Sequence, residues 1–224
     1  MKNALLAICL FAAIIAHGQS NQAGRISLSV GYGFVLGGVT IDQSLTQPGF
    51  SIALPQQTGF SIGQIYGIRG QYGINNLFSI GGYLRGESKG NATDDVNSND
   101  LTVSTAQGFG VGVEPRIYII NHKKFNLHAA PTVGFSSAST TTSGSNSGSD
   151  YSGSASGLNY GLTGGVNIFF LEMSSLGIGM SADFGYNHTS LSGTCTNDYA
   201  SSITRSQTFS AGGVYIGVGF AMHF

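Results

Sequence analysis

Charged side chains are scarce in this chain: only 8% of its 224 residues are Asp, Glu, Lys or Arg. A soluble domain carries charge on about a quarter of its residues, so the usual water-facing coat is missing. The net charge of -1 excludes a nucleic-acid binder, which needs a clustered basic face. Tryptophan is absent, but 14 Phe and 10 Tyr are far more than a disordered chain carries. The composition therefore indicates an ordered chain with little exposed charge.

Long apolar runs are also absent after the first 16 residues, which excludes a helical membrane span. The N-terminus has the layout of a secretory signal: a positive start, an apolar run over Ala4–Ala16, and small residues before a cleavage point after Gly18. The apolar run is too short for a bilayer. We therefore predict a signal peptide at residues 1–18, a mature N-terminus at Gln19, and one exported domain over residues 19–224.

Cysteine is nearly absent from the predicted mature chain, because removal of the signal leaves Cys195 alone. Neither an internal disulfide nor a thiolate metal cluster can form. We expect Cys195 to be a loop residue without a special role, since no His or Arg lies next to it in sequence to lower its pKa.

The chain does contain a period-two alternation of large apolar residues with small or polar residues, repeated along its length. From Arg25 to Phe34, for example, every second residue is Ile, Leu, Val, Tyr or Phe, which places all the large groups on one face of a strand. Eight such segments are predicted as strands, over residues 25–34, 60–74, 78–87, 101–119, 125–135, 159–170, 176–187 and 213–224. The even number favours an up-and-down antiparallel arrangement.

The links between these segments alternate between short and long. Short links lie at Asn75–Asn76, Asn121–Lys124 and Leu171–Ser175, and long polar links are predicted at Gly37–Gly59, Ser88–Asp100, Ser136–Gly157 and Thr189–Thr204. Short turns at one end and long loops at the other are typical of outer-membrane barrels. The third long link is Ser/Gly/Thr-rich, and we expect it to be mobile and extracellular.

The scarcity of charge decides which way the two faces point. A soluble barrel would need the apolar face inside and charge outside, but most of the few charges lie in predicted loops. We therefore expect the apolar face to contact lipid and the other face to line a narrow interior. This also explains the 35 glycines, many of which fall on inward positions, where an eight-stranded lumen has no room for large side chains.

Together, the signal, the eight alternating strands and the alternation of loop lengths resemble the small outer-membrane barrels of the OmpA and OmpX type, and especially the broad outer membrane protein beta-barrel domain family. The end of the chain is similar to that family as well, with Phe220, Met222 and Phe224 at every second position up to a terminal Phe. The resemblance implies an eight-stranded transmembrane β-barrel in the outer membrane, and an assembly signal at these three residues read by the barrel-assembly machinery. Its motifs specify architecture and not activity.

Six charged residues fall on the predicted inward face, three of each sign: Arg69, Arg85, Glu87, Glu114, Arg116 and Asp183. Equal numbers favour a paired network that plugs the lumen, and a charged constriction that selects a solute is the alternative. Glu114 and Arg116 lie two residues apart on one strand face, so we expect them to be in contact.

Two prolines interrupt this scheme. Pro115 and Pro131 fall inside predicted strands, almost opposite each other, where each removes a ladder hydrogen bond. We predict a bulge or local gap at this point.

Catalytic and metal motifs are weak. His188 and Ser190 resemble the His-x-Ser of lipid A deacylases, with only Asp198 left to orient the His. The acidic stretch from Asp94 to Asp100 has oxygen ligands spaced as in a calcium loop but lacks the Gly and the final Glu. We predict no catalytic residues, no metal and no cofactor.

The predicted function is therefore a structural or surface-interaction barrel, with a narrow channel for small or hydrophobic solutes and a membrane hydrolase as alternatives. Its expected partners are outer-membrane lipids, the assembly machinery, and an extracellular ligand of the long loops, with no nucleic acid.

Overall fold

The described part of the chain folds almost entirely into β-structure. The computed structural model describes residues 21–54, 56–93, 102–143, 151–173, 176–197 and 203–224. Its strands are β1 (Ile26–Gln47), β2 (Phe50–Ala53), β3 (Gln57–Gly73), β4 (Phe78–Thr93), β5 (Thr102–Val113), β6 (Arg116–His122), β7 (Phe125–Ser143), β8 (Tyr151–Glu172), β9 (Gly177–Asn197) and β10 (Thr204–His223). Among the described residues, no helix is long and apolar enough to cross a membrane.

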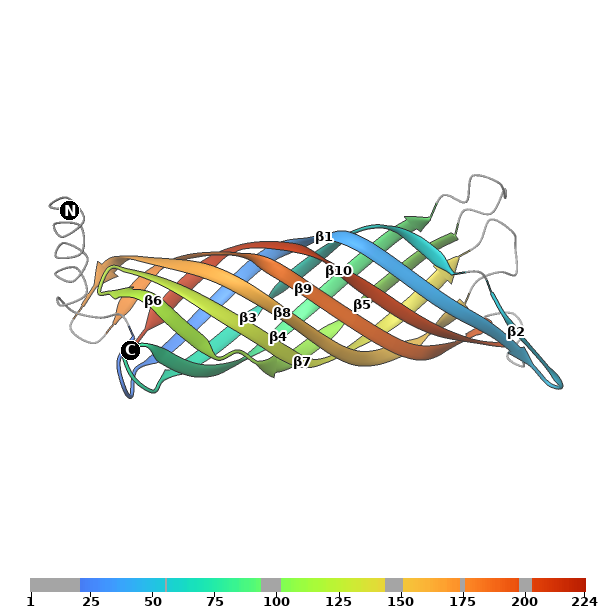
Figure 1. The fold of residues 1–224 in the computed structure, drawn as a ribbon, viewed down its shortest axis with the longest axis horizontal. Coiled ribbons are helices and arrows are strands. Elements are labelled where there is room, and N and C mark those ends of the chain that lie inside the picture. Colours follow the sequence, from blue (N-terminus) through green and yellow to red (C-terminus); the bar gives the residue numbers. More distant parts are fainter. Residues whose placement is uncertain (1–20, 55, 94–101, 144–150, 174–175, 198–202) are drawn as a thin grey trace, which may run out of the picture.

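The sheet closes on itself into a barrel. Each long strand pairs antiparallel with its sequence neighbour, and β10 returns to pair with β1 from Ser27↔His223 to Thr46↔Thr204. β5 and β6 share one position between β4 and β7, and β2 is a short hairpin extension of β1. The barrel wall therefore has eight strand positions, as the alternation predicts. The C-terminus lies at the end with the short turns, here the turn end, and β2 lies at the opposite loop end (Figure 1).

The two prolines have different effects on the wall. The ladder pairs Val113 with Val133 and Ile117 with Ala129, which places Pro115 opposite Pro131. The wall is interrupted at Glu114 and Pro115, between β5 and β6, whereas β7 continues through Pro131. The predicted local gap is confirmed on one of the two strands.

The strands continue far beyond the ends that the sequence predicts. β1 and β8 are 22 residues long, about twice the 9–11 residues that a membrane strand needs. Most of the four predicted long links is therefore strand, including Ser136–Ser143 and Tyr151–Gly157 of the link expected to be mobile. Residues 94–101, 144–150 and 198–202 lie outside the described residues. The error arose because a strand ladder uses backbone groups, so Ser/Thr-rich sequence can form it without an apolar outer face.

The outer face of the turn half carries a continuous apolar belt. On β1 the exposed apolar residues run from Ile26 to Leu36. Ten steps of about 3.3 Å along a strand tilted by about 40° give a height of about 25 Å, which matches the apolar band of outer-membrane barrels. Exposed aromatic side chains, such as Phe184 and Phe220, belong to the same belt. The predicted direction of the faces is confirmed for this half.

In the loop half, the polarity of the two faces is reversed. Seven inward positions there are apolar and buried and form one cluster, here the apolar layer: Val39, Ile41, Ala138, Ala155, Leu191, Phe209 and Ala211. On β1 the change follows Leu36, after which the apolar residues occupy inward positions. The loop half is thus built like a soluble barrel with a dry core.

The outside of the loop half is rich in hydroxyl groups and poor in charge. Cross-strand pairs connect Ser139 to Ser154, Ser154 to Thr194, and Ser206 to both Thr194 and Ser44. Similar rows lie on either side, and Asp42 is an exposed carboxylate beside them. This surface, here the hydroxyl wall, extends beyond the apolar belt.

The interior contains large aromatic side chains, which the sequence analysis did not expect. Tyr83 and Tyr215 point inward and are 5% exposed. A Cβ on Gly112 would lie 2.5 Å from the Tyr83 hydroxyl, and a Cβ on Gly33 would lie 2.7 Å from the Tyr215 ring. These inward glycines therefore make space for specific neighbouring rings.

The apolar layer predicts a test of how the loop half is stabilised. Leu191→Ala and Phe209→Ala each remove a side chain that is at most 3% exposed, and each should cost about 2–5 kcal/mol of unfolding free energy because a cavity remains. Urea titration of the detergent-solubilised protein measures this change. Leu162→Ala, on the lipid face and 59% exposed, is the control and should change stability far less. Equal effects at all three positions would show that Leu191 and Phe209 do not form a packed core.

Candidate functional site in the barrel interior

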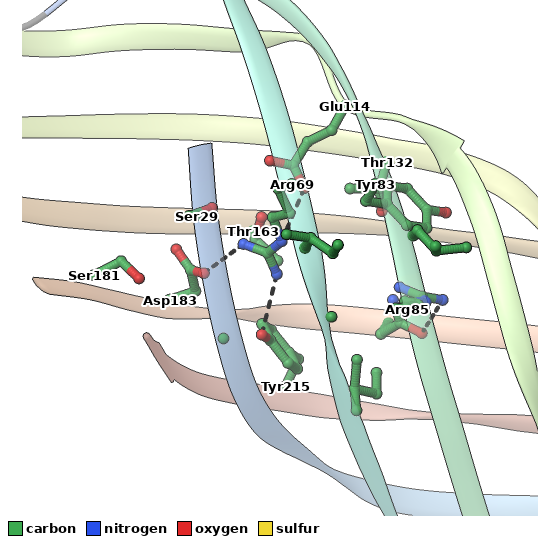
Figure 2. Close-up of a pocket in the computed structure, with 16 residues that line it drawn as sticks. Ser29, Arg69, Tyr83, Arg85, Glu114, Thr132, Thr163, Ser181, Asp183 and Tyr215 are labelled. Atoms are coloured by element: carbon green, nitrogen blue, oxygen red, sulfur yellow. Dashed lines mark hydrogen bonds and ion pairs between the residues drawn. The ribbon is translucent and has the colours of Figure 1, made fainter. Parts of the chain in front are cut away.

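Arg69 is the centre of a polar cluster inside the turn half. Its Nη1 lies 2.5 Å from Oδ2 of Asp183, and its Nε lies 3.5 Å from Oε2 of Glu114. Nη2 donates a hydrogen bond of 3.1 Å to the hydroxyl of Tyr215. Figure 2 shows these three partners around the guanidinium, although they come from β9, the β5–β6 junction and β10. One side chain of β3 therefore connects three other parts of the wall across the interior.

Glu114 and Arg116 form a buried pair at the proline interruption. Arg116 Nη2 and Nε donate to Oε1 of Glu114 at 2.6 and 2.8 Å, so the expected contact is present. Gln71 adds a hydrogen bond of 3.0 Å to the backbone oxygen of Glu114. Glu114 and Arg116 are 1% and 4% exposed. Because Glu114 contacts both Arg116 and Arg69, it is shared between two cations.

Arg85 and Glu87 form a second group with its own partners. Arg85 Nε lies 2.5 Å from Oε1 of Glu87, which also accepts a hydrogen bond of 3.2 Å from Ser136. The β3–β4 register pairs Arg69 with Tyr83, so Arg85 and Glu87 lie two and four residues further from the turn end. All six predicted charges thus point inward, but they lie at different heights and form two groups.

Uncharged side chains also belong to this interior, although only charged residues were predicted as members of its network. Tyr83 donates to Oδ1 of Asn159, and Asn159 Nδ2 donates 2.7 Å to Ser136. The guanidinium of Arg85 lies 4.9 Å from the centre of the Tyr83 ring. Their inward parity was visible in the sequence, but the selection of charges alone passed over Tyr and Asn.

A small cavity remains between the two groups. It has a volume of about 40 Å³, which is room for about three water molecules. Arg69, Arg85, Asp183 and Tyr215 are among its lining residues (Figure 2). A space of this size has room for water or a small ion.

The start of the described chain is hydrogen-bonded to the short turns at the turn end. Asn21 is 1% exposed. Its backbone N–H donates to Oδ1 of Asn121 at 3.0 Å, and its backbone oxygen accepts a hydrogen bond from Nδ2 of Asn121 at 2.7 Å. Asn21 Nδ2 also donates to the Asn75 oxygen at 2.7 Å. This segment therefore ties two neighbouring short turns together at the turn end.

The structure describes His188, Ser190 and Cys195 but not the other residues that the sequence singled out as weak motifs. The Nε2 atom of His188 lies 3.3 Å from the hydroxyl of Ser210 on β10, so the structure places His188 beside a different serine from the predicted Ser190. Asp198, the acidic stretch Asp94–Asp100 and the predicted signal at residues 1–18 lie outside the described residues. Cys195 was wrongly assigned to a loop: it lies in β9, fully buried, with Sγ 3.1 Å from Oγ1 of Thr140.

Two residues of the predicted assembly signal, Phe220 and Met222, lie on β10, and Phe224 directly follows its last residue. Phe220 and Phe224 are 64% and 50% exposed on the belt, and Met222 lies between them. The Phe224 N–H donates 2.8 Å to the oxygen of Ile26, which joins the last residue to the first strand.

The closed antiparallel barrel, its apolar belt and its polar interior agree with a comparison to known families. The outer membrane protein beta-barrel domain family matches residues 4–224 of the chain. The chain belongs to this family. Its location is therefore the outer membrane, where the short turns of such barrels face the periplasm and the loop end faces outward. No protein of curated function matches the sequence.

Solved structures support the fold at low sequence identity. The outer membrane protein OprG from Pseudomonas aeruginosa has 10% identity and a TM-score of 0.57, over 92% of this chain and 99% of OprG. Ail, the attachment invasion locus protein of Yersinia pestis, has 17% identity and a TM-score of 0.36, over 89% and 99% of the two chains. The outer membrane protease OmpT from Escherichia coli has 10% identity and a TM-score of 0.37, over 89% and 97%. OprG therefore shares the barrel fold, and the other two scores are too low for further comparison.

The buried Glu114–Arg116 pair predicts a specific loss of stability in this outer-membrane barrel. Arg116→Ala leaves a carboxylate without its closest cation in a buried place, which should cost about 3–5 kcal/mol. The measurement is the temperature at which the folded, fast-migrating gel band is lost. The double variant Glu114→Gln with Arg116→Met removes both charges and should recover much of the loss. Unchanged heat-modifiability of Arg116→Ala would show that the pair does not stabilise the barrel.

Proposed function

We propose that this chain is a closed outer-membrane barrel with a structural or surface-interaction role, whose lumen is plugged and which carries out no catalysis. The observation that supports this proposal best is the presence of several obstructions in series along the lumen. From the periplasmic side they are the Asn21–Asn121 cover, the Arg69 cluster with the Arg85–Glu87 group, and the apolar layer. Each obstruction is built from side chains of several strands. Displacement of a single strand would therefore not open the lumen.

The two inner obstructions resist solutes for different physical reasons. The charged groups are paired, so a passing ion would have to break buried ion pairs. The apolar layer offers no hydrogen bonds, so water and ions would lose hydration there. A solute that tolerates one obstruction is therefore stopped by the other. A narrow channel for small or hydrophobic solutes is the competing function. Single-channel recording decides between the plugged barrel and the channel.

The outer surface supports a contact role. The hydroxyl wall extends beyond the lipid belt with Ser and Thr side chains from several neighbouring strands. Such a surface presents many hydrogen-bond donors and acceptors with little net charge. The proposed partners are outer-membrane lipids along the belt, the assembly machinery at the final strand, and an extracellular ligand at the loop end.

Single-channel recording in planar bilayers tests the plug. We expect no resolvable current from the wild type. A variant with Leu191→Ser and Phe209→Ser should stay silent because the paired charges remain, as should a variant with Arg69→Ala and Asp183→Ala because the apolar layer remains. Combining these four changes with Arg85→Ala, Glu87→Ala and Asn121→Ala, which together weaken all three obstructions, should give a resolvable current.

The control for this test carries lipid-facing changes, Leu162→Ala with Phe184→Ala, and should stay silent. Discrete current steps from the wild type would overturn the plug and favour the channel. A silent variant with all of these changes that still shows heat-modifiability would show that the three obstructions do not close the lumen.

The proposed assembly signal has a separate test. Phe224→Ala should reduce the amount of heat-modifiable barrel in the outer-membrane fraction several-fold, while refolding of the purified chain in detergent is little changed. Phe170→Ala is the control because Phe170 is also lipid-facing, at 66% exposure, but is not in the final strand. An equal loss in both variants would show that only apolar surface matters.

A further inference from the structure

The loop end of the lumen has a polar mouth above the apolar layer. Going outward along β10, the inward residues are Phe209 of the apolar layer, then Gln207, then Arg205. Gln207 lies opposite Gln43 of β1, and Arg205 lies opposite Leu45. On β1 and β10 the described part of the mouth is therefore lined by amide side chains below the guanidinium of Arg205.

The floor of this mouth contains one glutamine whose amide N–H is hydrogen-bonded and one whose amide N–H has no acceptor. Gln207 Nε2 donates 2.7 Å to Oγ1 of Thr140, which contacts Sγ of Cys195 at 3.1 Å. Gln43, in contrast, is 7% exposed, and its Nε2 has no hydrogen-bond acceptor. A buried N–H group without an acceptor is unfavourable, so an acceptor is missing at this place.

Arg205 presents a second donor without an acceptor. Its buried Nε has no hydrogen-bond partner, and it forms no ion pair with any carboxylate of the described residues. The guanidinium lies 4.1 Å from the centre of the Tyr151 ring, which is 7% exposed and fixes the position of the cation. This cation is thus held in place by an aromatic face while its hydrogen-bonding capacity stays unused.

The two unused donors lie close enough to serve one ligand. Gln43 and Arg205 are diagonal neighbours on the inward face of adjacent strands, a relation that places Cβ atoms about 7–8 Å apart. Both side chains are long, so their donors can converge on one group. A positive charge and additional N–H donors, with no carboxylate paired to them among the described residues, favour an oxyanion.

We propose that the loop-end mouth is a binding site for a single oxyanion group, a carboxylate, sulfate or phosphate, held by Arg205 and Gln43 and positioned by Tyr151. The group is either a free ion or the acidic substituent of a saccharide, because both present the same oxygen atoms. This site lies on the outer side of the apolar layer, so it does not depend on whether the lumen is plugged.

The test uses the full chain in detergent micelles with ¹⁵N-labelled arginine. The arginines are Arg25, Arg69, Arg85, Arg116 and Arg205, so the Nε–H spectrum is simple enough to read directly. Titration with sodium sulfate, phosphate or acetate should shift one signal saturably, and that signal should be absent in Arg205→Gln. Gln43→Met should weaken the apparent affinity about tenfold, in line with the loss of one hydrogen bond to a charged group.

Controls separate specific binding from ionic strength and identify the source of the group. Sodium chloride should give no saturable shift, and Lys124→Gln, which removes a charge at the turn end, should bind like the wild type. A sugar sulfate that binds more tightly than free sulfate, with no response to the neutral sugar, would assign the group to a saccharide. Equal binding would assign it to a free ion. The absence of a saturable shift with every oxyanion in the folded wild type would overturn the proposal.

Discussion

The backbone hydrogen bonds between β1 and β10 are the constraint on which the rest of this structure depends. A strand edge exposed to hydrocarbon would leave unpaired N–H and C=O groups at a cost of several kcal/mol each, so the sheet has to close. Closure fixes the eight strand positions, and the pleat then sends alternate side chains to lipid and to the interior. The polar cluster exists because closure brings Arg69, Asp183 and Tyr215 together from distant parts of the chain.

The same wall serves two environments along its length. In the turn half the apolar face points to lipid and the interior holds paired charges. In the loop half the faces are reversed, with the apolar layer inside and the hydroxyl wall outside. A barrel can change in this way without a break because the ladder is made of backbone groups and is indifferent to which face is apolar. The result is a membrane barrel continued by a soluble-type barrel.

Much of the turn half was predictable because lipid imposes a simple rule on the sequence. The alternation from Arg25 to Phe34 could be read directly, and so could the inward parity of the six charges. The loop half was not predicted because its inward residues, such as Val39 and Ile41, follow a reversed parity after Gly37 and Gly38 and were assigned to a loop. The signal was present in the sequence, but an outer face of Ser and Thr has the composition of a loop.

The sequence by itself determined that the chain crosses the outer membrane as an eight-stranded barrel, which strand face of the turn half meets lipid, and that the six predicted inward charges are balanced, since parity and composition are local properties. Only the tertiary structure decided which charges pair, that Arg69 rather than Arg85 meets Asp183, and that Tyr83 and Tyr215 fit beside inward glycines. It also placed Arg205 beside Gln43 at the mouth. These contacts depend on strand tilt and on register between distant segments, and a single strand's sequence carries neither.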